Sequence, residues 1–395
     1  MIDFTVHHKD GHCEGRAGTL ATSHGVVPTP AFMPVGTLGP VKGIGPEDLQ
    51  DCGFSLMLNN AYHLYLRPGH EVIAGMGGLH HFTGWRGSIL TDSGGFQLVS
   101  LSDLREITDE GVTFKSHYDG SLHHYTPERC MEIQLALGSD IMMVLDECPP
   151  HLCTLDEAKQ AVRRTTKWAE RCRRFAEGRT QALFGIVQGA LNADLRRHSA
   201  QEIVDLDFDG YALGGLSLGE NKSAMLAMIE VSVKELPTTR PRYLMGVGFP
   251  EDLVEGVLRG IDLFDCVIPS RHGRTGWLFT TTGRVLIKQA RFARDESPID
   301  TQCSCPVCRR YSRAYLRHLF ISNEMLGMRL NTLHNLWYYR ALMTQLRVAI
   351  EKDLLLVFRE KFYEQRKDCP RSRAYAEAVG IAGLSGVSDK EHGTA

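Results

Sequence analysis

The chain has 395 residues, 43% of them hydrophobic, so it is long enough to bury a large core and to form more than one domain. Its formal net charge of −3 gives no bulk attraction to nucleic acid, so any RNA contact must come from local patches. The first residues, MIDFTVHHKDGHCEG, lack an apolar central run, and no stretch approaches the roughly 18 apolar residues that cross a bilayer. We therefore expect a cytoplasmic protein without a membrane segment.

Eight short apolar or β-branched runs recur along the chain. They are AFMPV from Ala31, FSLML from Phe54, SIL from Ser88, IMMVL from Ile141, ALFGIV from Ala182, GYAL from Gly210, YLMGV from Tyr243 and FDCVI from Phe264. The segments between them, such as TPERCMEIQLAL and FPEDLVEGVLRGI, have apolar residues at three- and four-residue spacing, which is typical of helices. This alternation predicts an α/β fold, and a count of eight favours a closed (β/α)8 TIM barrel over a doubly wound open sheet.

Polar residues follow several of these runs. Asp92 ends the third within TDSGGFQ, Asp146 follows the fourth in LDECPP, Gln188 follows the fifth in IVQGA, and the eighth contains Asp265. In a barrel the carboxyl ends of the strands converge on one mouth, where active sites lie. Each residue alone is equally expected as a cap or turn residue. The joint pattern predicts a ligand site at the mouth.

A metal site is predicted after the eighth run. Cys303, Cys305 and Cys308 form C-x-C-x-x-C, and His334 follows in NTLHN. Three thiolates and one imidazole are the complement of a closed, tetrahedral, structural Zn²⁺ site, with one ion in each subunit. Buried free thiols are the alternative for the cysteines, and other polar side chains that could replace the histidine are Asn331, His318 and His272.

The predicted domains follow from these patterns. Residues 1–295 are expected to form the (β/α)8 catalytic barrel, interrupted at about 100–126 by an insertion of short strands. Residues 296–368 are expected to form an inserted zinc-binding subdomain and C-terminal helices, and residues 369–395 a disordered tail that is small and polar. Two histidine pairs, His80 with His81 and His123 with His124, have no partner at ligand spacing, so we expect them at the surface.

The motifs TDSGGFQ, DECPP, GIVQGA, ALGGLSLGE, LMGVGFPED, FDCVIPSRHGRTG and the Cys-rich segment with its histidine resemble those of bacterial-type tRNA-guanine transglycosylases. The resemblance extends from Phe4 to Gln365 in the expected order. It implies a homodimer that exchanges guanine at wobble position 34 of tRNAs with a G-U-N anticodon for a deazaguanine base, in queuosine biosynthesis.

The resemblance also implies roles for two carboxylates. Asp265 matches the family's nucleophile and Asp92 its general acid/base. Cleavage of an N-glycosidic bond passes through an oxocarbenium-like transition state, so a carboxylate can capture the ribose C1′ covalently while the departing base is protonated. A second base then displaces Asp265, which retains the configuration at C1′.

Base recognition falls to other matched positions. The resemblance implies that Asp146 accepts from N1 and the exocyclic amine of guanine, that Gln188 and the Gly215 amide donate to O6, and that the Leu216 carbonyl accepts from an aminomethyl group. Phe96 is expected to stack on the base. Further positions are Cys148 and Leu218, expected in the pocket wall, and Glu220, expected to steady the peptide beside Leu216. The wall residues favour 7-aminomethyl-7-deazaguanine over the bulkier queuine.

Arginines supply the local positive charge that RNA requires. Arg271 and Arg274 lie in SRHGRTG, and contact with a single-stranded anticodon loop is expected there. A charged helix face is an equal alternative for the more distant residues Arg309, Arg310, Arg313, Arg317 and Lys361.

Other functions fit less well. A non-catalytic RNA-binding paralogue would lack the two catalytic carboxylates, whereas both are present. A metal-dependent barrel hydrolase would need an H-x-H or H-E-x-x-H motif, and the sequence shows none at the strand ends. An archaeal relative would carry further C-terminal modules. A queuine-inserting salvage enzyme remains the alternative within the family.

Overall fold

A closed barrel of eight parallel strands forms the centre of the computed structural model, which describes residues 2–100 and 105–381. The barrel confirms the predicted fold class, and each strand coincides with one of the eight apolar runs. The strands are β4 (Ala31–Gly36), β5 (Leu56–Asn60), β6 (Ser88–Asp92), β10 (Ile141–Met143), β11 (Ala182–Val187), β12 (Gly210–Leu213), β13 (Arg242–Leu244) and β14 (Leu263–Cys266).

Closure of the barrel explains why the runs are apolar throughout instead of alternating. The strands of a parallel barrel are covered on both faces, and every residue of β5 and β11 is buried. The last strand pairs with the first, with Phe264 opposite Phe32 and Asp265 opposite Met33. Asp265 therefore has a fixed height within the barrel wall.

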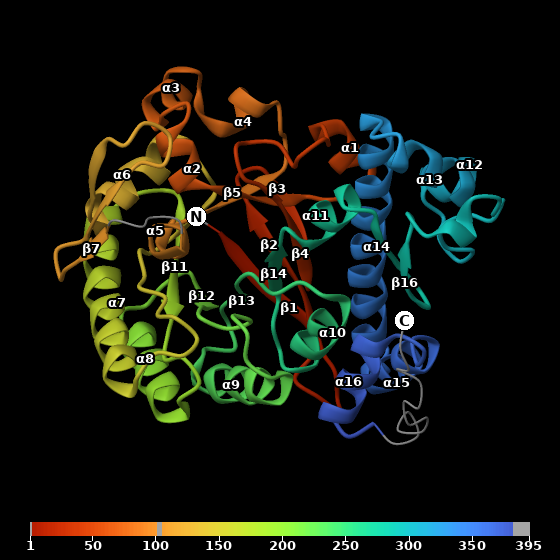
Figure 1. Ribbon diagram of the computed structural model, residues 1–395. Coiled ribbons are helices and arrows are strands. Elements are labelled where there is room, and N and C mark those ends of the chain that lie inside the picture. The colour runs from red at the N-terminus through yellow and green to blue at the C-terminus, as the bar shows by residue number, and fades with distance from the viewer. Residues whose placement is uncertain (1, 101–104, 382–395) are drawn as a thin grey trace.

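Helices surround the barrel between the strands (Figure 1). In chain order they are α1 (Pro46–Asp51), α2 (Ala61–Leu66), α3 (His70–Gly75), α4 (Gly78–Thr83), α5 (Gly95–Ser100), α6 (Pro127–Leu137), α7 (Leu155–Ala176), α8 (Ala193–Asp205), α9 (Lys222–Glu235), α10 (Pro250–Leu258) and α11 (Ile268–Arg274). The start of α7 illustrates how the sequence sets their ends, because Thr154 and Glu157 form a capping box there.

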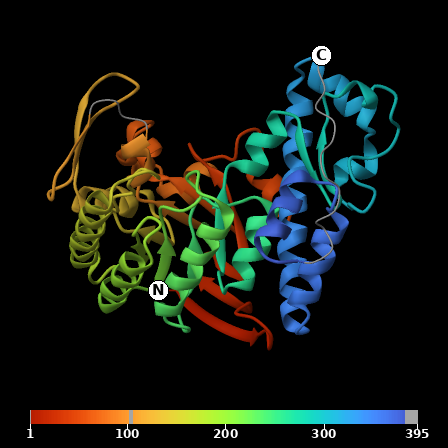
Figure 2. The ribbon, with the colours of Figure 1, turned by 60° about the horizontal axis from the view of Figure 1, so that its bottom comes forward.

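Two small antiparallel sheets are attached to the barrel. The predicted insertion is confirmed as β7 (Arg105–Ile107), β8 (Val112–Lys115) and β9 (Leu122–Tyr125), which project at one side in Figure 2. The other sheet, β1 (Asp3–Lys9), β2 (Arg16–Thr22) and β3 (Gly25–Thr29), was not predicted. It covers the amino ends of the barrel strands, where Arg16 binds Asp262 beside β14.

The chain continues into a second apolar cluster beside the barrel. It contains β15 (Trp277–Thr280), β16 (Gly283–Leu286), the 3-10 helix η1 (Ala290–Phe292), α12 (Pro306–Arg310) and α13 (Arg313–Ile321). The long helix α14 (Met325–Glu351) stands between this cluster and the barrel, next to α11 (Figure 1). The exact domain boundary at residue 295 stays a prediction.

The start of the predicted disordered tail is ordered. After α15 (Leu355–Gln365), residues 370–378 form α16 (Pro370–Ala378), in which Tyr375 is buried and its hydroxyl donates to Asp252. The prediction of disorder is therefore wrong for these residues, because one aromatic side chain and a buried network around Arg366 and Glu251 hold the helix on α10. Residues 382–395 lie outside the described part of the chain.

Candidate active site

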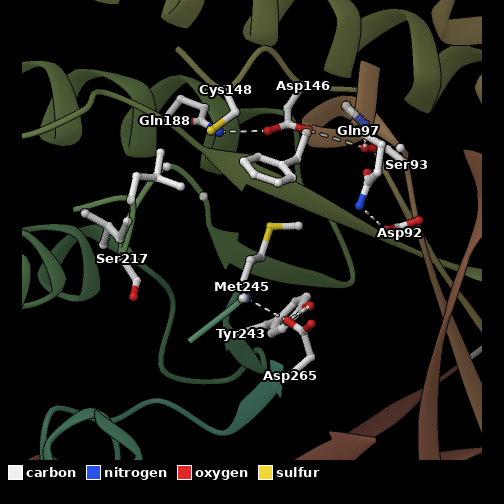
Figure 3. Close-up of a pocket in the computed structure, with 18 of the residues that line it drawn as sticks. Asp92, Ser93, Gln97, Asp146, Cys148, Gln188, Ser217, Tyr243, Met245 and Asp265 are labelled. Atoms are coloured by element: carbon white, nitrogen blue, oxygen red, sulfur yellow. Dashed lines mark hydrogen bonds between the residues drawn. The ribbon is translucent and has the colours of Figure 1, made fainter. Parts of the chain in front are cut away.

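A cavity of about 260 Å³ opens at the carboxyl ends of the barrel strands. It is smaller than the roughly 300–1,000 Å³ pockets that take drug-sized ligands, so it suits a small planar molecule. Figure 3 shows three carboxylates around it, with Asp146 at one end and Asp265 at the other. Nine of the residues proposed from the sequence line this one cavity: Asp92, Phe96, Asp146, Cys148, Gln188, Gly215, Leu216, Leu218 and Asp265.

Asp265 lies in the last barrel strand and receives two hydrogen bonds at one oxygen. The Tyr243 hydroxyl donates to Oδ1 at 2.6 Å and the Gly246 amide donates to the same atom at 2.7 Å. Burial raises the pKa of Asp265, and these two bonds oppose the rise by stabilising the carboxylate. The hydrogen bonds hold the group in a fixed orientation, as a reacting carboxylate requires. Tyr243 and Gly246 were not identified from the sequence.

Asp92 ends β6 and is held by the neighbouring strand. The Ala61 amide donates to Oδ1 at 2.9 Å, and the Asn60 side chain donates to Oδ2. Burial, together with the charges of Asp265 and Asp146, raises the pKa of Asp92 to about 8. A carboxyl group in this range is protonated at neutral pH and can donate a proton.

The other end of the cavity holds an acceptor and a donor side by side. Gln188 Nε2 donates to Asp146 Oδ2 at 2.7 Å, and Ser93 Oγ donates to Oδ1 at 3.3 Å. Burial raises the pKa of Asp146 to about 6, so the group is largely ionised at neutral pH. Because a primary amide nitrogen carries two hydrogens, Gln188 retains a second donor for a ligand.

A glycine-rich turn follows β12 along one wall. A Cβ at Gly215 would lie 2.5 Å from Gln188 Oε1, and the φ of Gly215 is +67°, so a glycine is required. The buried side chain of Arg196 donates to the Gly214 carbonyl at 2.8 Å and to the Ala190 carbonyl at 2.9 Å. Arg196 thus holds two turns of the wall in position, although its sequence context gave no sign of this.

Glu220 orients the peptide that follows Leu216. Its carboxylate accepts from the Ser217 amide, and from the Leu218 amide at 2.8 Å. Since the Ser217 N–H is directed to Glu220, the carbonyl of the same peptide, which belongs to Leu216, is directed the opposite way. Ser217 has a φ of 63°, so the peptide is held in a conformation that is uncommon for a residue with a Cβ.

Apolar side chains complete the lining. Phe96 stands at the rim of the cavity with 49% of its surface exposed, as a ring that stacks on a ligand would. Met245, missed by the sequence analysis, lies between the Asp146 end and the Asp265 end (Figure 3). Cys148 is buried, which raises the pKa of its thiol to about 12, and Leu218 also lines the cavity. Cys148 and Leu218 are therefore both uncharged residues of the cavity wall.

The two arginines proposed to contact RNA lie on α11, directly after β14. Arg271 is exposed, and Arg274 is half-buried with Nη1 lacking a hydrogen-bond partner within the described residues. Among the more distant basic residues, Arg313 instead pairs with Asp295 and Arg317 donates to the Gln289 carbonyl. These two have structural partners, whereas Arg309, Arg310 and Lys361 are exposed.

The four predicted metal ligands come together beside the barrel. Their ligand atoms lie within 4.8 Å of one another, and the sulfurs of Cys305 and Cys308 lie 3.5 and 3.4 Å from His334 Nδ1. His334 Nε2 lies 2.8 Å from the Phe279 carbonyl, so its hydrogen can be donated there and the Nδ1 lone pair remains for a metal. The Cys308 amide also donates to the Cys305 sulfur at 3.2 Å. The donor set fits a tetrahedral metal ion, and α14 carries one ligand to it.

One expectation about histidines is wrong. His80 is not a surface residue, because 15% of its side chain is exposed and Nε2 lies 3.3 Å from the buried Asp140. His123 is also partly buried, and its Nδ1 lies 2.7 Å from the Tyr65 hydroxyl. Both partners are distant in sequence, so no local spacing could reveal them. His81 and His124 are exposed, as expected.

No helix among the described residues is long and apolar enough to cross a membrane.

Comparison with known proteins identifies the family. The model of the family described as queuine tRNA-ribosyltransferase matches residues 10–368. The queuine tRNA-ribosyltransferase of Pelotomaculum thermopropionicum is 53% identical over 361 residues, which cover 91% of this chain and 98% of the relative. That of Desulforapulum autotrophicum is 54% identical over 369 residues, covering 93% of this chain and all of the relative. With its barrel, carboxylate-lined cavity and Cys-His cluster, the chain belongs to the queuine tRNA-ribosyltransferase family and is a transglycosylase.

Proposed function

We propose that the enzyme exchanges guanine at wobble position 34 of tRNAs with a G-U-N anticodon, those for Asp, Asn, His and Tyr, for 7-aminomethyl-7-deazaguanine. The observation that carries the proposal is the placement of two partly buried carboxylates, Asp92 and Asp265, on the same small cavity as a set of groups complementary to guanine. The reaction would serve queuosine biosynthesis, and a tRNA substrate agrees with the cytoplasmic location expected from the sequence.

The base is proposed to lie at the Asp146 end of the cavity. The ionised carboxylate accepts from N1–H and the exocyclic amine of guanine, and the free hydrogen of Gln188 Nε2 and the Gly215 amide donate to O6. Adenine has an unprotonated N1 and a donor in place of O6, so it would leave these buried groups unpaired. Phe96 and Met245 cover the faces of the ring. These contacts support selection of guanine-like bases.

The exchange is proposed to run as a double displacement at C1′. An oxygen of Asp265 forms a bond to C1′ while the bond from C1′ to N9 breaks, and the electron pair stays on guanine, which takes a proton from Asp92. The incoming base gives its N9 proton back to Asp92, and N9 then attacks C1′ and releases Asp265. Retention of configuration follows from the two inversions. Water must stay outside during the covalent stage, since hydrolysis would leave an abasic site.

The incoming base is proposed to be the aminomethyl form for two reasons. The Leu216 carbonyl, freed for the cavity by the bond between Glu220 and the Ser217 amide, is a suitable acceptor for an ammonium group. Cys148 and Leu218 narrow the wall beside it, which disfavours the larger substituent of queuine. Insertion of queuine is the alternative outcome.

Zinc is proposed as the occupant of the cluster formed by Cys303, Cys305, Cys308 and His334. The four side chains satisfy a tetrahedral ion completely, so the ion would act as a structural link between α12 and α14 and leave the chemistry to the carboxylates. Removing zinc should melt this region first.

RNA contact is proposed for Arg271 and Arg274, which lie on α11 directly after the strand that contains Asp265.

A homodimer is also proposed. Its support is the exposure of large apolar side chains where α13 ends and α14 begins, with Ile321 52% and Met325 84% exposed.

Incorporation of radiolabelled guanine into a tRNA transcript with a G-U-N anticodon tests the function. We expect incorporation by the zinc-loaded enzyme, none with a transcript that has adenine at position 34, and displacement of the label by 7-aminomethyl-7-deazaguanine. A folded, zinc-loaded protein that binds the transcript but incorporates no guanine would overturn the proposal and indicate an RNA-binding paralogue. Displacement by queuine with equal efficiency would overturn the choice of base.

A further inference from the structure

A second cluster of potential ligands lies at the end of the barrel opposite the cavity. His24 stands in the turn between β2 and β3, His80 lies in α4, and Asp140 directly precedes β10. The strand β6 begins beside this cluster at Ser88, whose hydroxyl contacts Thr22 at 2.8 Å, and ends at Asp92. At about 3.3 Å per residue the two ends of β6 are about 13 Å apart, so the cluster is separate from the candidate active site.

The two imidazoles face one carboxylate. His24 Nδ1 lies 2.7 Å from Asp140 Oδ1, and His80 Nε2 lies 3.3 Å from Oδ2. The rings stack with their centroids 3.5 Å apart and an angle of 14° between their planes. One ligand atom from each residue lies within 4.8 Å of the other two.

The carboxylate is fixed by further donors. Ser23 Oγ donates to Oδ1 at 2.7 Å and the Ile89 amide donates to Oδ2 at 2.8 Å, while the Gly87 carbonyl lies 3.1 Å from His80 Nε2. Burial opposes ionisation of Asp140, but hydrogen bonds from His80, His24 and Ser23 hold its pKa well below the usual range. The group is therefore an anion that cannot turn away from the two rings.

We propose that His24, His80 and Asp140 bind one divalent transition-metal ion, such as zinc or nickel. Two imidazoles and a carboxylate form a common ligand set for these ions. The ring planes must open from the stacked arrangement to share an ion. His24 can turn, because 39% of its side chain is exposed, and this exposure also gives the ion a path of entry.

The proposed ion is structural. It joins the N-terminal sheet through His24 to α4 through His80 and to the barrel through Asp140, three segments that are far apart in the sequence. At the amino ends of the strands, such a link affects stability and leaves catalysis unchanged. Metal binding should raise the melting temperature, since the ion binds only when the three segments are assembled.

Calorimetric titration of nickel into the full chain, already loaded with one zinc, tests the proposal. We expect one saturable equivalent for the wild type. His24→Gln and His80→Gln should weaken binding at least about tenfold, because loss of even an indirect partner costs that much. His81→Gln is the matched control, since His81 is the exposed neighbour of His80 on the same helix and should leave binding unchanged.

Melting curves provide the second measurement. Nickel should raise the melting temperature of the wild type and of His81→Gln, but not that of His24→Gln. Absence of a saturable nickel equivalent in the wild type, or equal binding by the wild type and His24→Gln, would overturn the proposal. Because His24 is half-exposed, its variant tests the site even if His80→Gln fails to fold.

Discussion

Asp92, which is partly buried, and Asp140, which is buried, both lie at ends of barrel strands, yet their pKa values move in opposite directions. At the mouth, burial and two neighbouring carboxylates raise the pKa of Asp92 to about 8. At the other end, two imidazoles, a hydroxyl and an amide surround Asp140 and lower its pKa despite burial. The difference shows that the barrel gathers like charges where a ligand enters and surrounds a carboxylate with hydrogen-bond donors where it holds the fold together.

The largest effect is expected at the mouth. Asp92→Asn removes the proposed proton donor, so the rate of guanine exchange should fall about 10²- to 10⁴-fold while the protein stays folded. Exchange rates compared with thermal melts of the same preparations provide the check. Activity within threefold of the wild type would show that Asp92 has no role as an acid or base.

The pH dependence of exchange sharpens the same point. If protonated Asp92 is required, kcat/KM should fall about tenfold per pH unit above its pKa of about 8. On acidification the rate should also fall, because Asp265 must be ionised and burial raises its pKa above the ordinary value. A profile that stays flat from pH 7 to 10 would contradict the assignment.

Stability should respond to pH in opposite ways at the two aspartates. The raised pKa of Asp92 means that its ionisation lowers the free energy of unfolding as the pH rises from about 4 to about 8. Asp92→Asn should therefore become more stable relative to the wild type over that interval.

The lowered pKa of Asp140 means that its contribution to stability is present above about pH 4 and is lost on acidification below that value. Asp140→Asn should therefore cost about 2 kcal/mol at pH 7. Denaturant unfolding at pH 3, 5, 7 and 9 measures both, and an equal pH response of the two variants would contradict the comparison.

The smallest effect concerns the pocket wall. The variant Leu218→Gly widens the cavity beside Leu216, so it should accept queuine better relative to the aminomethyl base, by about 10-fold for the few methylene-sized groups involved. Competition of the two bases for labelled tRNA measures the ratio, with Ser217→Ala as a control that changes a neighbouring lining residue by only one oxygen atom. An unchanged ratio would show that Leu218 does not set base size.

The sequence predicted the barrel because its signal is local. Each strand is a short run that is apolar throughout, and burial on both faces of a parallel barrel requires this pattern. The metal cluster could also be predicted from the sequence, because its three cysteines lie within six consecutive residues and only His334 is distant. Asp92, Asp146 and Gln188 could be proposed because each ends or follows such a run, and Asp265 because it is a charged residue inside one.

Contacts between distant segments could not be predicted in this way. The bond from Tyr243 to Asp265 depends on the height of two strands in the closed barrel, and the role of Arg196 depends on backbone carbonyls that leave no mark in the sequence. His80 was assigned to the surface because its partners, His24 and Asp140, are more than fifty residues away. The N-terminal sheet was missed although DFTVHHK alternates between exposed and half-buried positions.

The most direct test of the proposed chemistry is mass spectrometry of the enzyme mixed with a G-U-N anticodon tRNA and quenched with acid in the absence of a second base. The account predicts a covalent adduct between the tRNA ribose and the peptide that contains Asp265, absent from Asp265→Asn even though this variant still binds tRNA. Exchange by Asp265→Asn at the wild-type rate, or an adduct on a different residue, would contradict it.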